Sequence, residues 1–168
     1  YLLDLNEKML LEGKKRLQKE KNIKYFIGNA EKLNFENSFF DKYTISFCLR
    51  NVTEYLLSIK EAYRVLKPGG KYCCLEFSTP KSSLISSSYK IYKSKILPLL
   101  GEIVAKDKNA YKYLSESIDL FPSQEELSKN LRDCGFTKVK TINLFNGIVA
   151  IHTAVSYTHL TLPTTTIV

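Results

Sequence analysis

Residues 41–77 read DKYTISFCLRNVTEYLLSIKEAYRVLKPGGKYCCLEF, and this stretch decides the fold. Residues 41–49 are rich in β-branched and aromatic side chains, which is typical of a strand. From residue 55 to residue 66, apolar side chains recur at helical spacing. Pro68-Gly69-Gly70 ends that helix and turns the chain, and residues 71–77 return as a strand. The stretch therefore predicts a strand–helix–strand unit.

The same alternation extends toward the N-terminus. Residues 1–5 form a short apolar run that contains one acid, Asp4. Asn6 is suited to cap the helix that follows, because its side chain can accept a hydrogen bond from an unpaired N–H of the first turn. Residues 23–27 then read as a strand that ends at Gly28-Asn29-Ala30. This part of the chain predicts a second strand–helix–strand unit.

Toward the C-terminus the alternation is interrupted and then closed. Residues 82–114 indicate a helical insertion. Ser123 and the glutamates after it form a capping box for a helix that ends at Gly135. Residues 136–145 and 147–154 read as two strands joined by a hairpin turn. The whole pattern predicts an α/β fold with a mostly parallel sheet and an antiparallel C-terminal hairpin.

Length and composition favour one globular domain. The 168 residues are 44% hydrophobic and 25% charged, which excludes a disordered chain. The four cysteines include no Cys-x-x-Cys pair, so we interpret them as small buried side chains in a reducing compartment and expect no metal site. Residues 60–112 carry 11 basic and 4 acidic residues and hold most of the formal charge of +8. Such a patch suits an anionic membrane, whereas no recognition module accompanies it to suggest nucleic acid.

The last fourteen residues differ in composition from the rest. VSYTHLTLPTTTIV, residues 155–168, has no charged residue and five threonines. We therefore expect residues 1–154 to form the domain and residues 155–168 to be a non-native or unstructured tail. A further edge strand is the alternative.

Polar side chains gather where the predicted strands end. In parallel α/β sheets the carboxyl ends of the strands form the binding edge. The residues at these ends are Asp4, Asn29-Ala30, residues 46–51 and residues 76–78. An acid at such an end can accept two hydrogen bonds from a ribose diol, although it can equally cap the helix that follows.

Several segments together resemble one enzyme family. They are NAEKLNFENSFFD (29–41), TISFCLRNV (44–52), YRVLKPGG (63–70), LEFS (75–78), YLSESIDLFPSQEEL (113–127), CGF (134–136) and FNGIVAIH (145–152). In order and spacing they resemble the ubiquinone/menaquinone C-methyltransferase family, over about Leu2 to Thr153. YRVLKPGG alone marks only the wider class of S-adenosylmethionine-dependent methyltransferases. The resemblance implies a Rossmann-like class I methyltransferase fold and the methylation of a ring carbon of a polyprenylated benzoquinol or naphthoquinol.

The resemblance also implies which residues would bind S-adenosylmethionine. Asp4 would hold the ribose, and Asn29 and Ala30 would contact the adenine through a side-chain amide and the backbone. Ser46 would lie near the methionine end of the cofactor. The alternatives are a helix cap for Asp4 and an ordinary strand hydroxyl for Ser46.

For the quinol, the resemblance implies a pocket lined by Arg50 and Asn51. Arg50 would stabilise the developing phenolate or orient a water, and Asn51 would position that water. Arginine is too basic to act as a simple proton acceptor. Arg50 could instead be a surface ion-pair partner. Glu76 is either a second pocket carboxylate or a structural hydrogen-bond acceptor, and the sequence leaves that choice open.

The sequence departs from the family pattern at its start. The family domain begins with a strand and a glycine-rich turn, and the strand belongs between those that end at Asp4 and near Ser46. We therefore expect this chain to be an N-terminally truncated and poorly active part of such an enzyme. Smaller departures are Asn34 for a usual proline, and Cys48 for a usual glycine, which we expect to crowd the pocket floor.

Partners and location follow from the implied lipid-borne substrate. Residues 82–98 alternate lysines with apolar side chains, which suits peripheral membrane contact, or else a helix packed over the active site. A homodimer or a quinone-biosynthesis complex is compatible with this interpretation. We expect the bacterial cytoplasm or the mitochondrial matrix, beside the inner membrane. The other functions considered are a different small-molecule methyltransferase and a non-catalytic scaffold.

Overall fold

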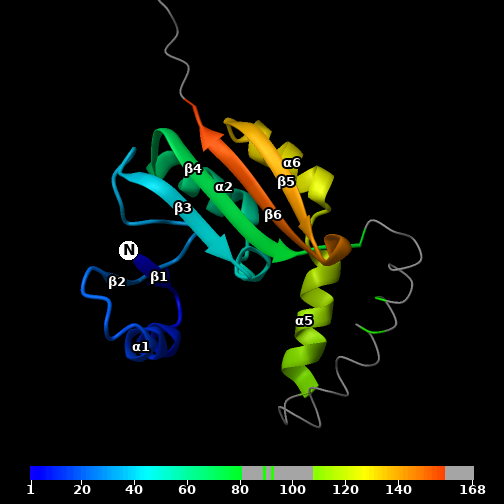
Figure 1. Ribbon diagram of the computed structural model, residues 1–168, viewed down its shortest axis with the longest axis horizontal. Helices are drawn as coiled ribbons and strands as arrows, with labels where there is room; N and C mark the ends of the chain where they lie inside the picture. Colours follow the sequence, from blue (N-terminus) through cyan, green and yellow to red (C-terminus); the bar gives the residue numbers. More distant parts are fainter. Residues whose placement is uncertain (81–88, 90–91, 93–107, 158–168) are drawn as a thin grey trace, which may run out of the picture.

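A computed structural model of the protein describes residues 1–80, 89, 92 and 108–157 (Figure 1). In the described part, two short strands near the N-terminus, β1 (Leu2–Asp4) and β2 (Tyr25–Ile27), pair in parallel. Helix α1 (Glu7–Arg16) connects them, and Asn6 caps it as predicted, because its side chain accepts a hydrogen bond from the N–H of Lys8. This unit lies beside the larger sheet, next to its β3 edge (Figure 1).

The larger sheet has the strand order β3-β4-β6-β5. Its strands are β3 (Phe40–Ser46), β4 (Leu66–Phe77), β5 (Phe136–Leu144) and β6 (Val149–Ser156). β3 and β4 are parallel, whereas β6 runs antiparallel to both β4 and β5. The predicted α/β fold, with parallel strands followed by an antiparallel C-terminal hairpin, is confirmed.

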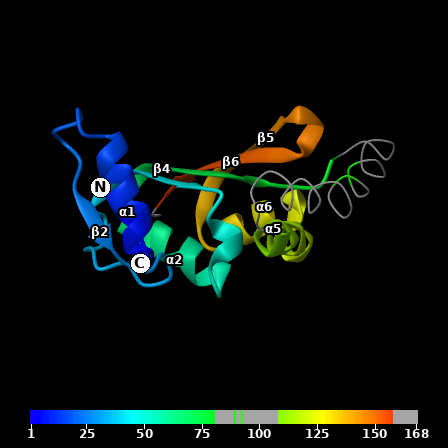
Figure 2. The ribbon, with the colours of Figure 1, turned by 90° about the horizontal axis from the view of Figure 1, so that it is seen from below.

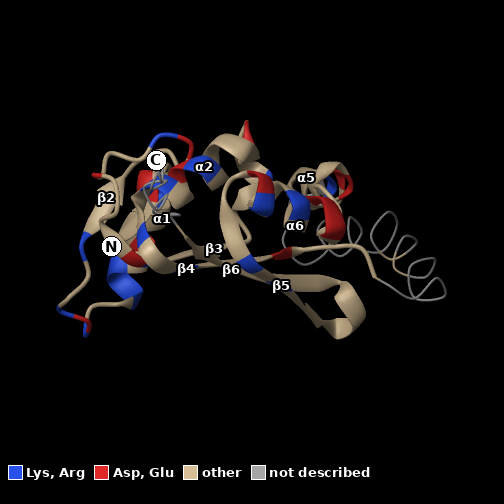
Figure 3. Ribbon diagram, turned by 90° about the horizontal axis from the view of Figure 1, so that it is seen from above, with Lys and Arg blue, Asp and Glu red and all other residues tan. Residues whose placement is uncertain are grey.

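Three helices lie on one side of this sheet. They are α2 (Tyr55–Val65), α5 (Lys108–Leu120) and α6 (Gln124–Asp133). Seen with the sheet nearly edge-on, all three lie on the same side of it (Figure 2). Charged residues gather on α1, α5 and α6, whereas β6 carries none (Figure 3).

The core lies between this sheet face and helices α2 and α6. Its members are fully or almost fully buried: Ile45, Leu49, Ile59, Ala62, Leu66, Tyr72, Cys74, Leu127, Leu131, Phe136 and Ala154. Burying one large apolar side chain stabilises a fold by roughly 1.5–3 kcal/mol. The core therefore fixes β3 and β4 against α2 and α6, and with them the residues that follow these strands.

Three predicted boundaries are wrong. The strand predicted over residues 71–77 begins at Leu66, so Pro68-Gly69-Gly70 lies within β4, where the pairing with β3 is irregular. The strand predicted over residues 41–49 ends at Ser46, because Phe47 adopts a left-handed backbone conformation (φ 51°) and the short 3-10 helix η1 (Leu49–Asn51) follows. The tail predicted from residue 155 begins too early, because β6 continues through Ser156, which is buried. There, Val155 pairs with Lys71 of β4.

The predicted insertion, residues 82–114, falls largely outside the described residues, as do residues 158–168. Within it, the rings of Tyr89 and Tyr92 stack with centroids 6.5 Å apart. Helix α5 starts inside the predicted insertion and runs past its expected end to Leu120. None of the described helices is long and apolar enough to cross a membrane.

Candidate functional site

A cleft of about 1310 Å³ opens between the β1–β2 unit and β3. Its lining includes Asp4, Asn29, Ala30 and Ser46, the four residues predicted to bind the cofactor, together with Asn51. These residues come from segments far apart in the sequence. Parallel strands bring them together, because their carboxyl ends meet at one edge of the fold.

Asp4 ends β1 and turns the chain into α1. Its Oδ1 accepts a hydrogen bond from the N–H of Asn6 at 2.8 Å. The helix cap itself is Asn6, so the alternative of Asp4 as the cap is not what the structure has. No hydrogen bond among the described residues engages Oδ2 of Asp4. This carboxylate oxygen, on the wall of the cleft, is the acceptor that a ribose diol requires.

The side-chain amide of Asn29 is already engaged within its own loop. Nδ2 donates to Glu31 Oε2 at 3.0 Å, and Oδ1 accepts the N–H of Glu31 at 2.9 Å. Glu31 in turn accepts a hydrogen bond from the backbone N–H of Glu54. The amide predicted to meet a base edge therefore shapes the loop, and contact with a base would fall to the backbone around Ala30.

Gly28 is the one glycine among the described residues that line the cleft. A Cβ at this position would lie 2.9 Å from Leu3 Cδ1, so glycine allows β2 to approach β1 closely. The glycine-rich turn of the family pattern has no counterpart among these lining residues. The cleft is thus lined by the residues predicted for the nucleoside part of the cofactor and by no glycine-rich turn among the described residues.

A strained turn follows β3. Phe47 is a bulky residue with φ 51°, a conformation that costs an L-residue about 1–2 kcal/mol. It is held by a hydrogen bond from its N–H to Leu75 O at 2.8 Å, and its ring lies 4.9 Å from that of Phe77. Its carbonyl accepts from Arg50 Nη1 at 2.8 Å and from Asn51 Nδ2 at 3.4 Å. The turn therefore links Ser46 to both predicted catalytic residues.

Arg50 is a buried ion-pair partner, not a surface one. Its Nη1 lies 2.7 Å from Glu76 Oε1, and the two side chains are only 10% and 2% exposed. Its guanidinium carbon lies 5.3 Å from the centroid of the Phe77 ring. Glu76 also accepts the N–H of Phe77 at 2.9 Å. Of the two interpretations left open for Glu76, the geometry favours the structural acceptor.

Asn51 connects the cleft to helix α5. It lines the cleft, and its Oδ1 accepts a hydrogen bond from the hydroxyl of Tyr113 at 3.2 Å. Arg50, although adjacent in sequence, is not among the residues that line this cleft. The structure thus places Asn51 in contact with the cleft and Arg50 behind it.

Cys48 lines the cleft, as expected from its replacement of a glycine. Partial burial raises the pKa of its thiol, and the nearby carboxylates of Asp4 and Glu76 raise it further. A protonated thiol is a poor nucleophile, so we interpret Cys48 as a part of the cleft wall. Within the described part of the chain, no three His, Cys, Asp or Glu residues are grouped so as to hold a metal ion.

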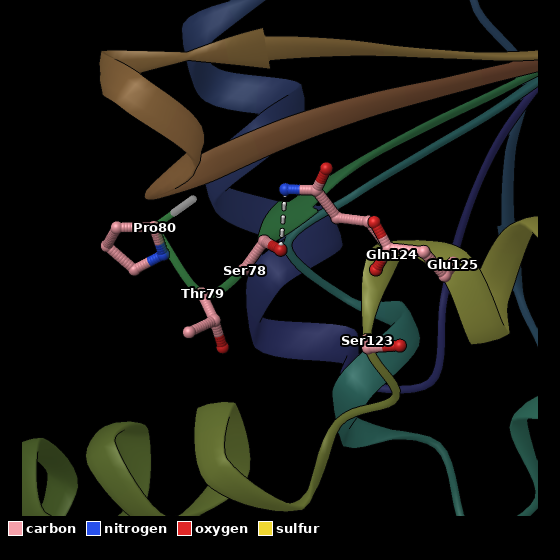
Figure 4. Close-up of a pocket in the computed structure, with 6 residues that line it drawn as sticks. All are labelled: Ser78, Thr79, Pro80, Ser123, Gln124 and Glu125. Carbon is pink, nitrogen blue, oxygen red and sulfur yellow. Dashed lines mark hydrogen bonds between the residues drawn. The ribbon is translucent and has the colours of Figure 1, made fainter. Parts of the chain in front are cut away.

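A second cavity, of about 410 Å³, lies at the carboxyl end of β4 (Figure 4). It is formed where residues 78–80 meet the first turn of α6, at residues 123–125. There, Gln124 Nε2 donates to Ser78 Oγ at 3.0 Å, and the carbonyl of Gln124 lies 3.3 Å from Nε2 of the buried His152. The sequence showed Ser123 to Glu126 only as a capping box, so it did not identify this cavity.

Comparison with known proteins decides the family. A model of the ubiE/COQ5 methyltransferase family matches residues 1–156. The chain belongs to this family. A family member from Gallus gallus, named as a mitochondrial 2-methoxy-6-polyprenyl-1,4-benzoquinol methylase, is 49% identical over 152 residues; the match covers 89% of this chain and 49% of that protein. The ubiquinone/menaquinone biosynthesis C-methyltransferase UbiE of Rickettsia bellii RML369-C is 48% identical over 156 residues, covering 91% and 63%. The chain thus spans about half to two-thirds of the length of these two family members.

Solved structures show that the fold is that of S-adenosylmethionine-dependent methyltransferases. One such enzyme from Thermotoga maritima, a possible histamine N-methyltransferase, matches with a TM-score of 0.64 at 20% identity, covering 92% of this chain and 72% of that one. The phosphoethanolamine N-methyltransferase 2 of Haemonchus contortus, solved with S-adenosyl-L-methionine, matches with a TM-score of 0.66 at 16% identity, covering 93% and 43%. The family's expected Rossmann-like class I fold is confirmed.

Proposed function

We propose that this chain acts in the S-adenosylmethionine-dependent C-methylation of a polyprenylated benzoquinol or naphthoquinol, in ubiquinone or menaquinone biosynthesis. The observation that carries the proposal is the cleft that gathers Asp4, Asn29, Ala30 and Ser46 beside Asn51. Family membership supports the same reaction, because relatives in this family are named for quinol and quinone-pathway C-methylation.

The residues of the cleft fit the cofactor. The volume exceeds the roughly 300–1,000 Å³ of a usual small-molecule site, which leaves room for a nucleoside and its amino-acid arm. Asp4 would bind the ribose hydroxyls through Oδ2, and the backbone at Ala30 would meet the adenine. Ser46 would lie toward the methionine end. When bound, S-adenosylmethionine supplies a sulfonium methyl group to an electron-rich carbon.

Arg50 and Asn51, which follow β3, would help to deprotonate the quinol so that its ring carbon becomes a nucleophile. A phenol becomes a carbon nucleophile when its O–H proton is removed, and a water held by Asn51 would take that proton. Arg50 would stabilise the phenolate by hydrogen bonding, since a guanidinium is a strong donor at every relevant pH. After the new C–C bond forms, the ring carbon loses its hydrogen as a proton to water, and the aromatic ring is restored.

Arg50 has donor capacity left for this role. Its Nε is buried and has no hydrogen-bond partner among the described residues. Buried donors without partners are rare in folded proteins, and a catalytic role or a bound water is among the reasons for which they are retained. A phenolate oxygen, or the water beside it, would satisfy this N–H.

The proposed partners follow from the lipid nature of the substrate. Residues 82–98, which lie outside the described part except for Tyr89 and Tyr92, would contact an anionic membrane surface through lysines and apolar side chains. No binding to anionic vesicles in co-sedimentation would contradict this. The chicken relative is named as mitochondrial, and we propose the matrix or the bacterial cytoplasm for this chain. A homodimer or a quinone-biosynthesis complex is part of the same proposal.

The proposal is tested by cofactor binding and by methyl transfer. Calorimetry with S-adenosylhomocysteine, and transfer of a labelled methyl group to a short-chain 2-methoxybenzoquinol, are measured on the gene product as it is made in the cell. Asp4→Asn should weaken S-adenosylhomocysteine binding about 10- to 100-fold, because a charge-assisted hydrogen bond is lost. Glu12→Gln, an exposed acid on α1, is the control. Absence of both binding and transfer in the unaltered protein would favour a non-catalytic scaffold.

A further inference from the structure

We infer that Glu76 is a positioning residue for methyl transfer, which acts by holding the guanidinium of Arg50 in the orientation that meets the quinol oxygen. The inference rests on the proposed function, because it concerns the catalytic role of Arg50. It goes beyond that proposal in naming a residue of β4, 26 positions away in sequence, on which this role depends.

Glu76 accepts two hydrogen bonds from Arg50. Its Oε1 accepts from the guanidinium Nη1 at 2.7 Å, and its Oε2 accepts from the backbone N–H of the same residue at 3.4 Å. The N–H of Phe77 also donates to Oε1, at 2.9 Å. Both carboxylate oxygens are thus occupied by protein donors, and the side chain is 2% exposed. A carboxylate in this position holds its neighbour and does not meet substrate.

The contacts with Glu76 determine which guanidinium nitrogens of Arg50 have protein hydrogen-bond partners. Nη1 is used twice, by Glu76 and by the carbonyl of Phe47 at 2.8 Å. Among the described residues, no hydrogen bond engages Nε or Nη2, the two nitrogens of the guanidinium edge opposite Cδ, and Nε is fully buried. This edge is the fork with which arginine binds an oxyanion through two parallel N–H bonds. Glu76 therefore leaves the edge that the proposed reaction needs without a hydrogen-bond partner among the described residues.

The charge of Glu76 is as necessary as its geometry. A guanidinium that is only 10% exposed requires an opposite charge nearby, because burial of an unpaired cation is costly. The ring of Phe77 against the guanidinium excludes water from one side. Without the carboxylate, the arginine side chain would turn toward solvent and lose its orientation. The carbonyl of Phe47, in the left-handed turn, would then lose the hydrogen bond that it accepts from Arg50 Nη1.

A double-mutant cycle tests the inference. Methyl-transfer kcat and the S-adenosylhomocysteine Kd are measured for the gene product as it is made in the cell, for Glu76→Gln, for Arg50→Met and for the double variant. We expect Glu76→Gln to lower kcat about 10- to 100-fold and to change Kd less than about threefold. In the Arg50→Met background, the same substitution should change kcat by less than about threefold, because its target is gone.

A matched control and a second measurement complete the test. Asp41→Asn removes a carboxylate from the opposite end of β3, where it pairs with Lys67 at 2.8 Å, and should leave kcat unchanged. In NMR of the unaltered protein, the protons on Nη1 of Arg50 should be resolved and exchange slowly. This measurement remains decisive if Glu76→Gln does not fold.

The outcomes separate the two proposals. Independent, multiplicative effects of the two substitutions, an unchanged kcat in Glu76→Gln, or a freely rotating guanidinium would overturn the positioning role. Lack of methyl transfer in the unaltered protein would overturn the proposed function itself, and it is seen before any substitution is made.

Discussion

Arg64 and Glu61 stand three residues apart on α2 and form a two-point ion pair, with Nε 2.7 Å from Oε1 and Nη2 2.8 Å from Oε2. Both also reach the segment that precedes β3. Glu61 accepts the N–H of Leu33 at 2.7 Å, and Arg64 donates to the carbonyls of Leu33 at 2.9 Å and Phe35 at 2.8 Å. Helix α2 thereby holds the chain directly after the cleft-lining loop of Asn29 and Ala30.

Replacing Arg64 should release this segment. Arg64→Met removes the donors to two backbone carbonyls and leaves a half-buried carboxylate without its cation. We expect the free energy of unfolding to fall by about 2 kcal/mol in urea titrations, given the partial exposure of the pair. Arg16→Met, which breaks an exposed pair with Glu12 on α1, should cost no more than about 0.5 kcal/mol. An equal fall in the free energy of unfolding in the two variants would show that the ion pair on α2 does not hold the segment before β3.

The same pair should make stability depend on acidity. The hydrogen bond from Arg64 lowers the pKa of Glu61 below its ordinary value of 4.5, and partial burial opposes this. Because the pKa is lower in the folded state than in the unfolded one, the stabilisation is complete above about pH 4.5 and is lost as pH falls through the folded value. The gap in unfolding free energy between the unaltered protein and Glu61→Gln should shrink from pH 7 to pH 3. A gap that is constant with pH would contradict the assignment.

The sequence predicted the elements well because their signals are local. Asn6 caps α1 and Ser123 caps α6, as their positions indicated, since a cap is a contact between residues two or three apart. The end of β3 was not predictable in this way. Phe47 takes a left-handed conformation, against the preference of a bulky side chain, because it donates a hydrogen bond to β4 and accepts one from η1. Those partners come together only in the folded chain.

In the candidate site, too, some features could be predicted from the sequence and others could not. The rule that strand ends meet at one edge predicted that Asp4, Ala30 and Ser46 would line one cleft, and they do. The pairing of Arg50 with Glu76 depends on the register of β3 against β4, which sequence alone does not give. The pair of Glu61 and Arg64 was likewise hidden within what read simply as an amphipathic helix. Which side chain supports which needs the packed structure.

An exposed, strained aromatic residue offers a test of backbone energetics. Phe145, in the short 3-10 helix η4 (Phe145–Gly147), has φ 47° and is 80% exposed. Glycine adopts this conformation without steric cost, and little apolar burial would be lost. Phe145→Gly should therefore leave the unfolding midpoint unchanged or raise it, by up to about 1 kcal/mol in free energy. A clear loss of stability would show that the ring makes contacts worth more than the strain.

The hydroxyl of Tyr113 on α5 donates to Asn51 Oδ1 at 3.2 Å, and both side chains are exposed. If Asn51 positions the water that accepts the quinol proton, its amide must be oriented, and Tyr113 supplies the one hydrogen bond that Oδ1 receives from the described residues. Tyr113→Phe should lower methyl-transfer kcat about 3- to 10-fold, by the loss of a neutral hydrogen bond, while the unfolding midpoint changes little. Tyr111→Phe, on the same helix, is the matched control and should leave kcat unchanged. Equal effects of the two substitutions would mean that α5 supports the fold of this region and does not orient Asn51.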